Sequence, residues 1–147
     1  MGHETYMAQA LELARQAMAE GEVPVGCVIV KDGVVVGRGR NRRETCRTAL
    51  GHAEIEAIAQ ACETLGGWRL AGCALYVTLE PCPMCAGAIV NARIPAIYYG
   101  AKDDKAGCCG SVLNLFEERF NHHPRIYSGI LGAECAGLLQ EFFADLR

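Results

Sequence analysis

Two short segments of the sequence constrain the fold more than any other feature. They are His52-Ala53-Glu54 and Pro81-Cys82-Pro83-Met84-Cys85. Cys82 and Cys85 stand three residues apart at a predicted helix start, so both sulfur atoms can point to one side of the first turn. The N-terminus of a helix stabilises thiolates, the form of cysteine that binds metals. His52 begins a different predicted helix, so a fold that joins these two helix ends assembles three metal ligands.

One histidine and two cysteines form a ligand set that suits zinc. Three protein ligands leave a tetrahedral zinc ion one open position for water. The pKa of such a water falls from about 15.7 to about 7, which makes it a hydroxide nucleophile near neutral pH. Glu54 could take the proton of this water and pass it to a substrate. Side chains two apart on an ideal helix diverge by about 200°, so Glu54 reaches the metal only if the helix presents its first turn end-on to the pocket.

The cysteine content leaves a second interpretation of this cluster open. The chain contains nine cysteines, so a structural zinc site closed by a fourth cysteine is the alternative, although the placement of Glu54 and Pro81 favours catalysis. The adjacent pairs Cys108-Cys109 and His122-His123 are interpreted as loop positions, because neighbouring residues rarely bind one metal. The cysteines outside the cluster are interpreted as small buried hydrophobes, namely Cys27, Cys46, Cys62, Cys73, Cys108, Cys109 and Cys135.

Apolar periodicity and turn residues predict strands that alternate with helices. The predicted helices cover residues 4–20, 52–65, 81–92, 111–116 and 132–146, and the predicted strands cover 27–31, 34–37, 74–79, 94–99 and 125–128. Asp32-Gly33 between the first two strands is typical of a hairpin turn. The alternation predicts an α/β layered domain whose sheet is mainly parallel beyond the first hairpin. No repeat or linker interrupts the pattern, so we expect one domain over residues 1–147.

Large apolar side chains outside the strands are assigned to the interior. The last predicted helix is expected to bury Leu138, Leu139, Phe142 and Phe143. Trp68 is assigned to the core rather than to a base-stacking surface.

Composition favours a cytoplasmic protein. Hydrophobic residues make up 51% and charged residues 21%, which is ordinary for a globular domain. The first 22 residues contain Glu4, Glu12, Glu20 and Glu22, unlike a signal peptide. No apolar run approaches the length of a membrane span, so no membrane partner is expected.

The charge distribution is compatible with a polyanionic partner despite a net charge of −3. Residues 38–47 contain five arginines and one glutamate, a local charge of +4, which leaves −7 on the rest of the chain. A basic segment on an acidic body can hold a polyanion without making the whole protein adhesive. From charge alone, a solvated arginine-rich loop is the favoured interpretation. The candidate phosphate contacts are Arg38, Arg40, Arg42, Arg43 and Arg47.

The two opening segments match the zinc-deaminase signature H-x-E…P-C-x-x-C. Further segments resemble the TadA-type tRNA adenosine deaminases of bacteria, within the cytidine/deoxycytidylate deaminase superfamily, almost letter for letter. These are Glu22-Val23-Pro24-Val25-Gly26, Leu75-Tyr76-Val77-Thr78-Leu79-Glu80-Pro81-Cys82, Met84-Cys85-Ala86-Gly87-Ala88-Ile89, Gly100-Ala101-Lys102-Asp103, Lys105-Ala106-Gly107, Gly110-Ser111 and Asn121-His122. The resemblance covers essentially the whole chain.

The resemblance implies a three-layer α/β/α cytidine-deaminase-like fold around a five-stranded mixed sheet. It implies a homodimer with one Zn²⁺ per chain, and hydrolysis of adenosine to inosine at the first anticodon position, the wobble position, in a tRNA anticodon stem-loop. Asn41 occupies the family's position for a side chain that reads the purine, although alone it would be interpreted as a turn residue. Asp103 and Lys105 fall in a loop that borders the substrate.

Two other functions remain open. The first is deamination of free bases or nucleosides such as guanine or cytosine, which would use the same metal chemistry. The second is a non-catalytic zinc-stabilised RNA-binding module, which Glu54 disfavours. The segment before His52, Arg47-Thr48-Ala49-Leu50-Gly51, and the pair Cys108-Cys109 depart from the usual family pattern.

Overall fold

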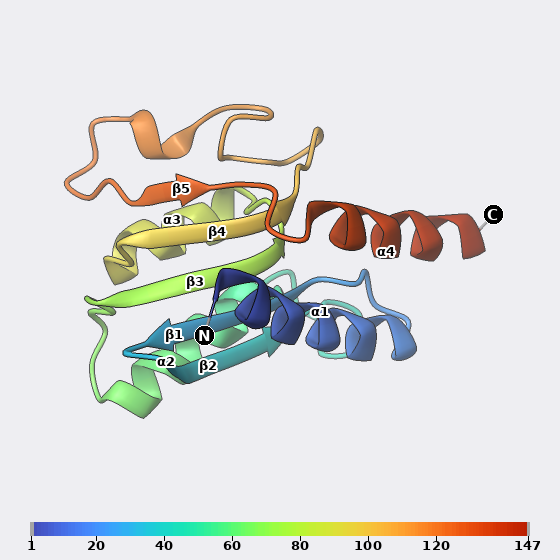
Figure 1. Ribbon diagram of the computed structural model, residues 1–147, viewed down its shortest axis with the longest axis horizontal. Helices are drawn as coiled ribbons and strands as arrows, with labels where there is room; N and C mark the ends of the chain where they lie inside the picture. Colours follow the sequence, from blue (N-terminus) through green and yellow to red (C-terminus); the bar gives the residue numbers. More distant parts are fainter. Residues whose placement is uncertain (1, 147) are drawn as a thin grey trace.

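A mixed five-stranded sheet forms the centre of the structure, a computed structural model that describes residues 2–146. Its strands are β1 Gly26–Lys31, β2 Val34–Arg40, β3 Cys73–Leu79, β4 Ala96–Ala101 and β5 Arg125–Tyr127. They lie side by side in the order β2-β1-β3-β4-β5 (Figure 1). β1 runs antiparallel to β2 and β3, whereas β3, β4 and β5 run parallel. The predicted hairpin and the parallel sheet beyond it are confirmed.

Helices cover both faces of this sheet, which confirms the three-layer α/β/α architecture. The helices are α1 His3–Ala19, α2 Ala53–Leu65, α3 Pro83–Ala92 and α4 Gly132–Asp145. α1 and α4 lie on one face, and α2 and α3 lie on the other (Figure 1). Side chains alternate between the layers along each strand. On β3, for example, Leu75 and Val77 pack with α2 and α3, whereas Tyr76 packs with α1.

β2 is longer than the sequence predicted. Glycine was interpreted as the end of this strand, but its two glycines lie inside it and pack against α2. The predicted strand stopped at residue 37, but the observed one includes Arg38 and Arg40. A Cβ atom on Gly37 would lie 2.3 Å from the carbonyl oxygen of Ala57, and one on Gly39 would lie 2.1 Å from that of Ala53. The two glycines therefore let α2 lie directly on the strand.

Three further predictions about apolar residues and short elements are wrong. The expected helix at 111–116 is a short 3-10 turn, η1, at Leu115–Glu117, which begins where the Asn114 side chain accepts a hydrogen bond from the Phe116 amide. Trp68 is 56% exposed instead of buried in the core, and the guanidinium groups of Arg69 and Arg93 lie over its ring. Cys46 is exposed, whereas it was expected to be buried.

The last helix, α4, is also less buried than expected. Only Cys135 is fully buried in it, and Leu138, Leu139 and Phe142 are half-buried. Phe143 is exposed. α4 contacts β4 and β3 near its start, and it then extends beyond the ends of the strands (Figure 1). Among residues 2–146, no helix combines the length and the apolar character that a membrane span requires.

Candidate active site

A cavity of about 200 Å³ opens where the ends of several strands meet the starts of α2 and α3. The segment before β1, the loop after β2 and the loop after β4 complete its walls. The lining residues are Val23, Val25, Asn41, Arg43, His52, Glu54, Leu79, Glu80, Cys82, Asp103 and Ala106. The cavity thus brings together residues that are up to 83 positions apart in the chain.

The three predicted metal ligands form one cluster at the cavity wall. His52 is the N-cap residue of α2, and Cys82 is the N-cap residue of α3. The Nδ1 atom of His52 lies 3.5 Å from the sulfur atoms of both Cys82 and Cys85. All three candidate ligand atoms lie within 4.8 Å of one another, and within residues 2–146 no fourth histidine, cysteine or acidic residue joins them. This geometry disfavours a structural site closed by a fourth cysteine.

The electrostatics of the cluster favour a bound cation. A hydrogen bond from the Cys85 thiol, together with His52, lowers the pKa of Cys82 to about 4. The same contact with Cys82 and burial raise the pKa of Cys85. The hydrogen bond with Cys82 also raises the pKa of His52. One thiolate beside an imidazole and a second sulfur is the donor chemistry that zinc prefers, so the residues fit this metal.

Glu54 lies in the same cavity as the cluster. It is the second residue of α2 and is only 4% exposed. Burial raises its pKa to about 7, so the carboxyl group can both accept and release a proton near neutrality. The helix presents its first turn end-on to the cavity, and for this reason His52 and Glu54 face one space although they are two positions apart.

Two of the three predicted substrate-binding residues line the cavity. They are Asn41, which follows β2, and Asp103, which follows β4. The Asp103 side chain also accepts hydrogen bonds from the amides of Lys105 and Ala106, at 3.0 and 3.2 Å, and so closes a turn. Lys105 is exposed and does not line the cavity.

The five arginines of the basic segment have different surroundings. The side chain of Arg40 forms two hydrogen bonds with Glu20, at 2.8 and 3.1 Å. Arg42 Nε lies 3.2 Å from a carboxylate oxygen of Glu56, an ion pair without hydrogen-bond alignment. Acidic side chains on the protein thus neutralise two of the five charges.

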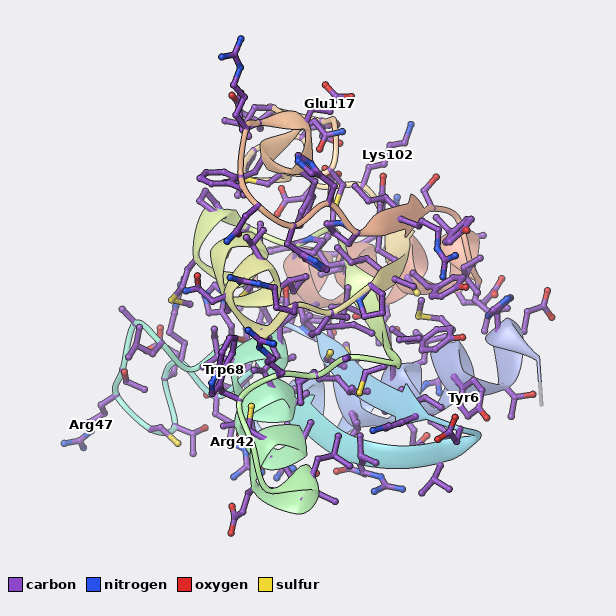
Figure 2. All side chains as sticks on the ribbon, turned by 90° about the vertical axis from the view of Figure 1, so that its left-hand side faces the viewer. Tyr6, Arg42, Arg47, Trp68, Lys102 and Glu117 are labelled. Atoms are coloured by element: carbon purple, nitrogen blue, oxygen red, sulfur yellow. The ribbon has the colours of Figure 1, made fainter. Side chains whose placement is uncertain are left out.

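The remaining three arginines have no acidic partner within ion-pair distance among residues 2–146. Arg43 lines the cavity. Arg47 stands at the far end of its loop, directed away from the body of the molecule (Figure 2). Arg38 is exposed beside Gln60 and Glu63 of α2, at a separate hollow. Only Arg43 is therefore placed directly at the candidate site.

Two buried carboxylates were not among the predicted site residues, although one of them, Glu80, lines the cavity. Glu22 and Glu80 are each 2% exposed, and each accepts several hydrogen bonds from a neighbouring loop. Hydrogen bonds outweigh burial and hold the pKa of both groups below the usual 4.5. The sequence does contain a pattern that indicates these two residues. Each is an acidic residue in an otherwise apolar segment with a proline, as in Glu22-Val23-Pro24-Val25 and Leu79-Glu80-Pro81.

The arrangement is specific to one class of protein. A helix-start histidine, a glutamate two residues on, and a Pro-Cys-x-x-Cys segment at a second helix start, all over a mixed sheet, define the zinc deaminases of the cytidine-deaminase-like fold. The sequence profile of the MafB19-like deaminase family matches residues 1–147, and the chain belongs to this family.

Similar proteins narrow the group further. The tRNA-specific adenosine deaminase of Bacillus subtilis (strain 168) is 50% identical, over 98% of this chain and 90% of that protein. The protein of the same name from Agrobacterium fabrum (strain C58 / ATCC 33970) is 48% identical over 97% of this chain and 94% of its own length. Within its family, the chain is therefore a member of the TadA-type deaminases.

Solved structures give the same grouping. A structure from studies of A-to-I editing by tRNA:A34 deaminases has a TM-score of 0.88 and 47% identity, over 91% of this chain and 98% of that one. A Bacillus subtilis guanine deaminase has a TM-score of 0.66 and 44% identity, over only 69% of this chain and 66% of its own. The likeness to the tRNA deaminase extends over more of both chains.

Proposed function

We propose that this protein deaminates adenosine at the first anticodon position of a tRNA, converting adenosine and water into inosine and ammonia. The observation that carries the proposal is the cavity in which Glu54, with a pKa of about 7, lies beside the cluster of His52, Cys82 and Cys85. The near full-length similarity to proteins named tRNA-specific adenosine deaminases supports the substrate.

His52, Cys82 and Cys85 would hold the zinc ion. Once bound, zinc would supply Lewis-acid chemistry and lower the pKa of a water molecule so that it can attack at neutral pH. The protein's own part is to set the ligands in place: the N-termini of α2 and α3 stabilise negative charge, and both lie at the cavity wall.

Glu54 would move the protons of the reaction. Its carboxylate would take one proton of the attacking water and deliver it to N1 of the purine ring. It would then carry the water's second proton, from the new hydroxyl group at C6, to the departing amine, which leaves as ammonia. Burial within the cavity excludes bulk water from the carboxyl group, and a pKa near neutrality suits a group that must both take up and release a proton.

The walls of the cavity would hold the flipped-out nucleoside. Asn41 lines the wall after β2, and its amide can contact N7 or N3 of the purine, because N6 is the leaving amine. Arg43 and Arg47 extend from this wall toward solvent, where phosphates of an RNA loop would meet them. A loop nucleotide also costs less to unstack than one in a duplex.

We also propose that the protein is a cytoplasmic homodimer. Large apolar side chains are exposed near the cavity. Leu50 lies in the loop between β2 and α2, and Val112 and Leu113 lie in the segment between β4 and η1. A second copy would cover such residues. Sedimentation equilibrium should then give twice the chain mass of 15.8 kDa, and a monomer at micromolar concentration would contradict the dimer.

Deamination of free guanine is the second candidate, and the partial likeness to a guanine deaminase favours it over other free-base reactions. The test compares ammonia release from an anticodon stem-loop and from guanine, cytosine and adenine at equal concentration. We expect turnover of the stem-loop adenosine, with inosine as the product. Faster turnover of guanine would replace the tRNA proposal, and no turnover of any substrate by zinc-loaded protein would favour a binding module.

A further inference from the structure

Glu22 joins the loop after β2 to the body of the protein. Its Oε1 accepts a hydrogen bond from the Glu44 amide at 3.2 Å, and its Oε2 accepts bonds from the amide and hydroxyl of Thr45, both at 2.6 Å. Glu44 and Thr45 are exposed, whereas Glu22 is buried. A carboxylate fixed in the body of the protein thus holds a surface loop.

The rest of this loop, residues 41–51, bonds largely to itself. The Arg42 amide donates to the carbonyl oxygen of Gly51, the Cys46 amide to that of Arg42, and the Thr48 amide to that of Arg43. These bonds close the loop, but they do not fix its position over the cavity. At its start the Asn41 amide donates to Val25, so Glu22 supplies the attachment in the middle of the loop.

Glu80 has the same relation to the loop after β4. Its Oε1 accepts a hydrogen bond from the Asp103 amide at 3.0 Å, and its Oε2 accepts bonds from the amides of Cys109 and Ser111 at 2.8 and 3.2 Å. The Ser111 hydroxyl also donates to Oε1. A Cβ atom on Gly107 would lie 2.3 Å from the Glu80 carboxyl carbon, so this loop encloses the carboxylate closely.

We propose that Glu22 and Glu80 are a pair of positioning residues, each of which fixes one wall of the substrate cavity through hydrogen bonds from the loop that forms this wall. The proposal rests on the proposed function for its consequence in catalysis, but the attachment itself is a property of the fold. Glu22 positions the wall that carries Asn41 and Arg43, and Glu80 positions the wall that carries Asp103 and Ala106.

A glutamine cannot replace either residue. Both carboxylate oxygens accept hydrogen bonds in each case, whereas an amide offers one oxygen and one NH₂ group. The NH₂ group would face an amide N–H, so at least one donor of the loop would lose its partner. The remaining bonds would also lose the strength that a charged acceptor gives.

The two walls should affect different kinetic constants. A loose 41–51 loop must be ordered when RNA binds, so its freedom weakens binding. The loop after β4 contacts the metal-ligand segment directly, since the Cys108 amide donates to the carbonyl oxygen of Pro81 at 2.9 Å. Its displacement should therefore change the chemical step more than binding.

Amide hydrogen exchange tests the attachment without any substrate. In Glu22→Gln we expect exchange within residues 41–51 to rise about tenfold or more, the factor that corresponds to one lost hydrogen bond to a charged group. Exchange within residues 103–111 should stay at the parental rate, and Glu80→Gln should give the reverse pattern. Glu12→Gln removes an exposed carboxylate of α1 and serves as the matched control. Unchanged exchange in the expected loop, or an equal rise everywhere, would overturn the proposal.

Weaker variants keep the test usable if either glutamine variant fails to fold. Thr45→Val removes only the hydroxyl donor to Glu22, and Ser111→Ala removes only the hydroxyl donor to Glu80. Each should loosen its own loop and leave the other unchanged. Parental exchange rates in both loops of both variants would overturn the proposal as well.

Steady-state kinetics on a stem-loop then test the consequence for catalysis. We expect Glu22→Gln to raise KM about tenfold with kcat within about threefold, and Glu80→Gln to lower kcat about tenfold with KM within about threefold. Equal changes of both constants in both variants would show a general structural role and contradict the division. If the parental protein does not deaminate the stem-loop, the proposed function fails, whereas the exchange result still decides the attachment.

Discussion

The proposed reaction depends on the position of the Glu54 carboxyl group beside the ligand cluster. Helical periodicity separates it from His52 by about 200°, yet both line one cavity because α2 meets the site with its N-terminal end. The sequence reveals which face of a helix is buried, because apolar residues repeat along that face. It does not reveal the angle at which the end of the helix meets a pocket, because that angle depends on the sheet on which the helix packs.

Replacing Glu54 with glutamine tests its role. Glu54→Gln keeps the shape of the side chain but cannot carry a proton, so we expect folding and zinc content to be retained. Turnover should fall by about 10²–10⁴-fold, the usual contribution of one acid–base group. Stopped assays of inosine formation with equal amounts of zinc-loaded protein measure the loss. Activity within a few-fold of the parent would mean that another group moves the protons.

The ligand cluster makes a second residue-scale prediction. His52→Ala, Cys82→Ala and Cys85→Ala should each lose most of their zinc, because each removes one of only three ligands. Cys46→Ala is the control, since Cys46 is exposed and outside the cluster. Metal analysis by mass spectrometry after gel filtration should find about one zinc ion per chain in the parent and the control. Full zinc in Cys82→Ala would show that the ligands are assigned wrongly.

At the scale of elements, sequence patterns predicted what periodicity and turn chemistry determine. The hairpin at Asp32-Gly33, the parallel strands and all four long helices are confirmed. The errors occur where packing decides. Gly37 and Gly39 leave room for α2 to lie directly on β2, and Trp68 lies outside the core with two guanidinium groups over its ring. Neither contact leaves a periodic signal in the sequence.

The basic segment shows the same limit for charge. The sequence counts five arginines there, but it does not reveal that Arg40 and Arg42 are paired with glutamates from α1's end and α2. A charge that is already paired on the protein gains less from a phosphate. Arg43 and Arg47 are therefore the stronger candidates for RNA contacts, because Arg43 lines the cavity and Arg47 stands at the far end of the same loop (Figure 2).

This difference predicts unequal effects on RNA binding. The double variant Arg43→Gln with Arg47→Gln should bind a stem-loop more weakly. The slope of log affinity against log salt concentration should become shallower by roughly 0.7–0.9 for each lost contact. The matched double variant Arg40→Gln with Arg42→Gln should change the slope less. Fluorescence anisotropy between low and physiological salt measures both. Equal slopes for the parent and the Arg43 and Arg47 variant would restore the interpretation of a solvated loop.

At the scale of the whole molecule, the site depends on acidic residues that stay ionised inside the protein. Glu22 is the clearest case, because burial would raise its pKa but hydrogen bonds from Thr45 and Glu44 hold it below the usual 4.5. A carboxyl group with a lower pKa in the folded state than in the unfolded state favours folding when it is ionised. Its contribution is complete above pH 4.5 and is lost as the pH falls from there through the lowered pKa.

The free energy of unfolding should therefore decrease as the pH falls below 4.5, and Glu22 should account for part of the slope. In Glu22→Gln, which cannot take up this proton, we expect lower stability at pH 7 and a shallower decrease below pH 4.5. Glu12→Gln should keep the parental slope, because this exposed side chain holds no loop amide. Urea titrations at several pH values give the free energy of unfolding of the parent and of the two variants. All three proteins contain the same ligand cluster, so the loss of metal in acid cancels when their free energies are compared. A slope in Glu22→Gln equal to that of the parent would show that Glu22 does not couple folding to its ionisation.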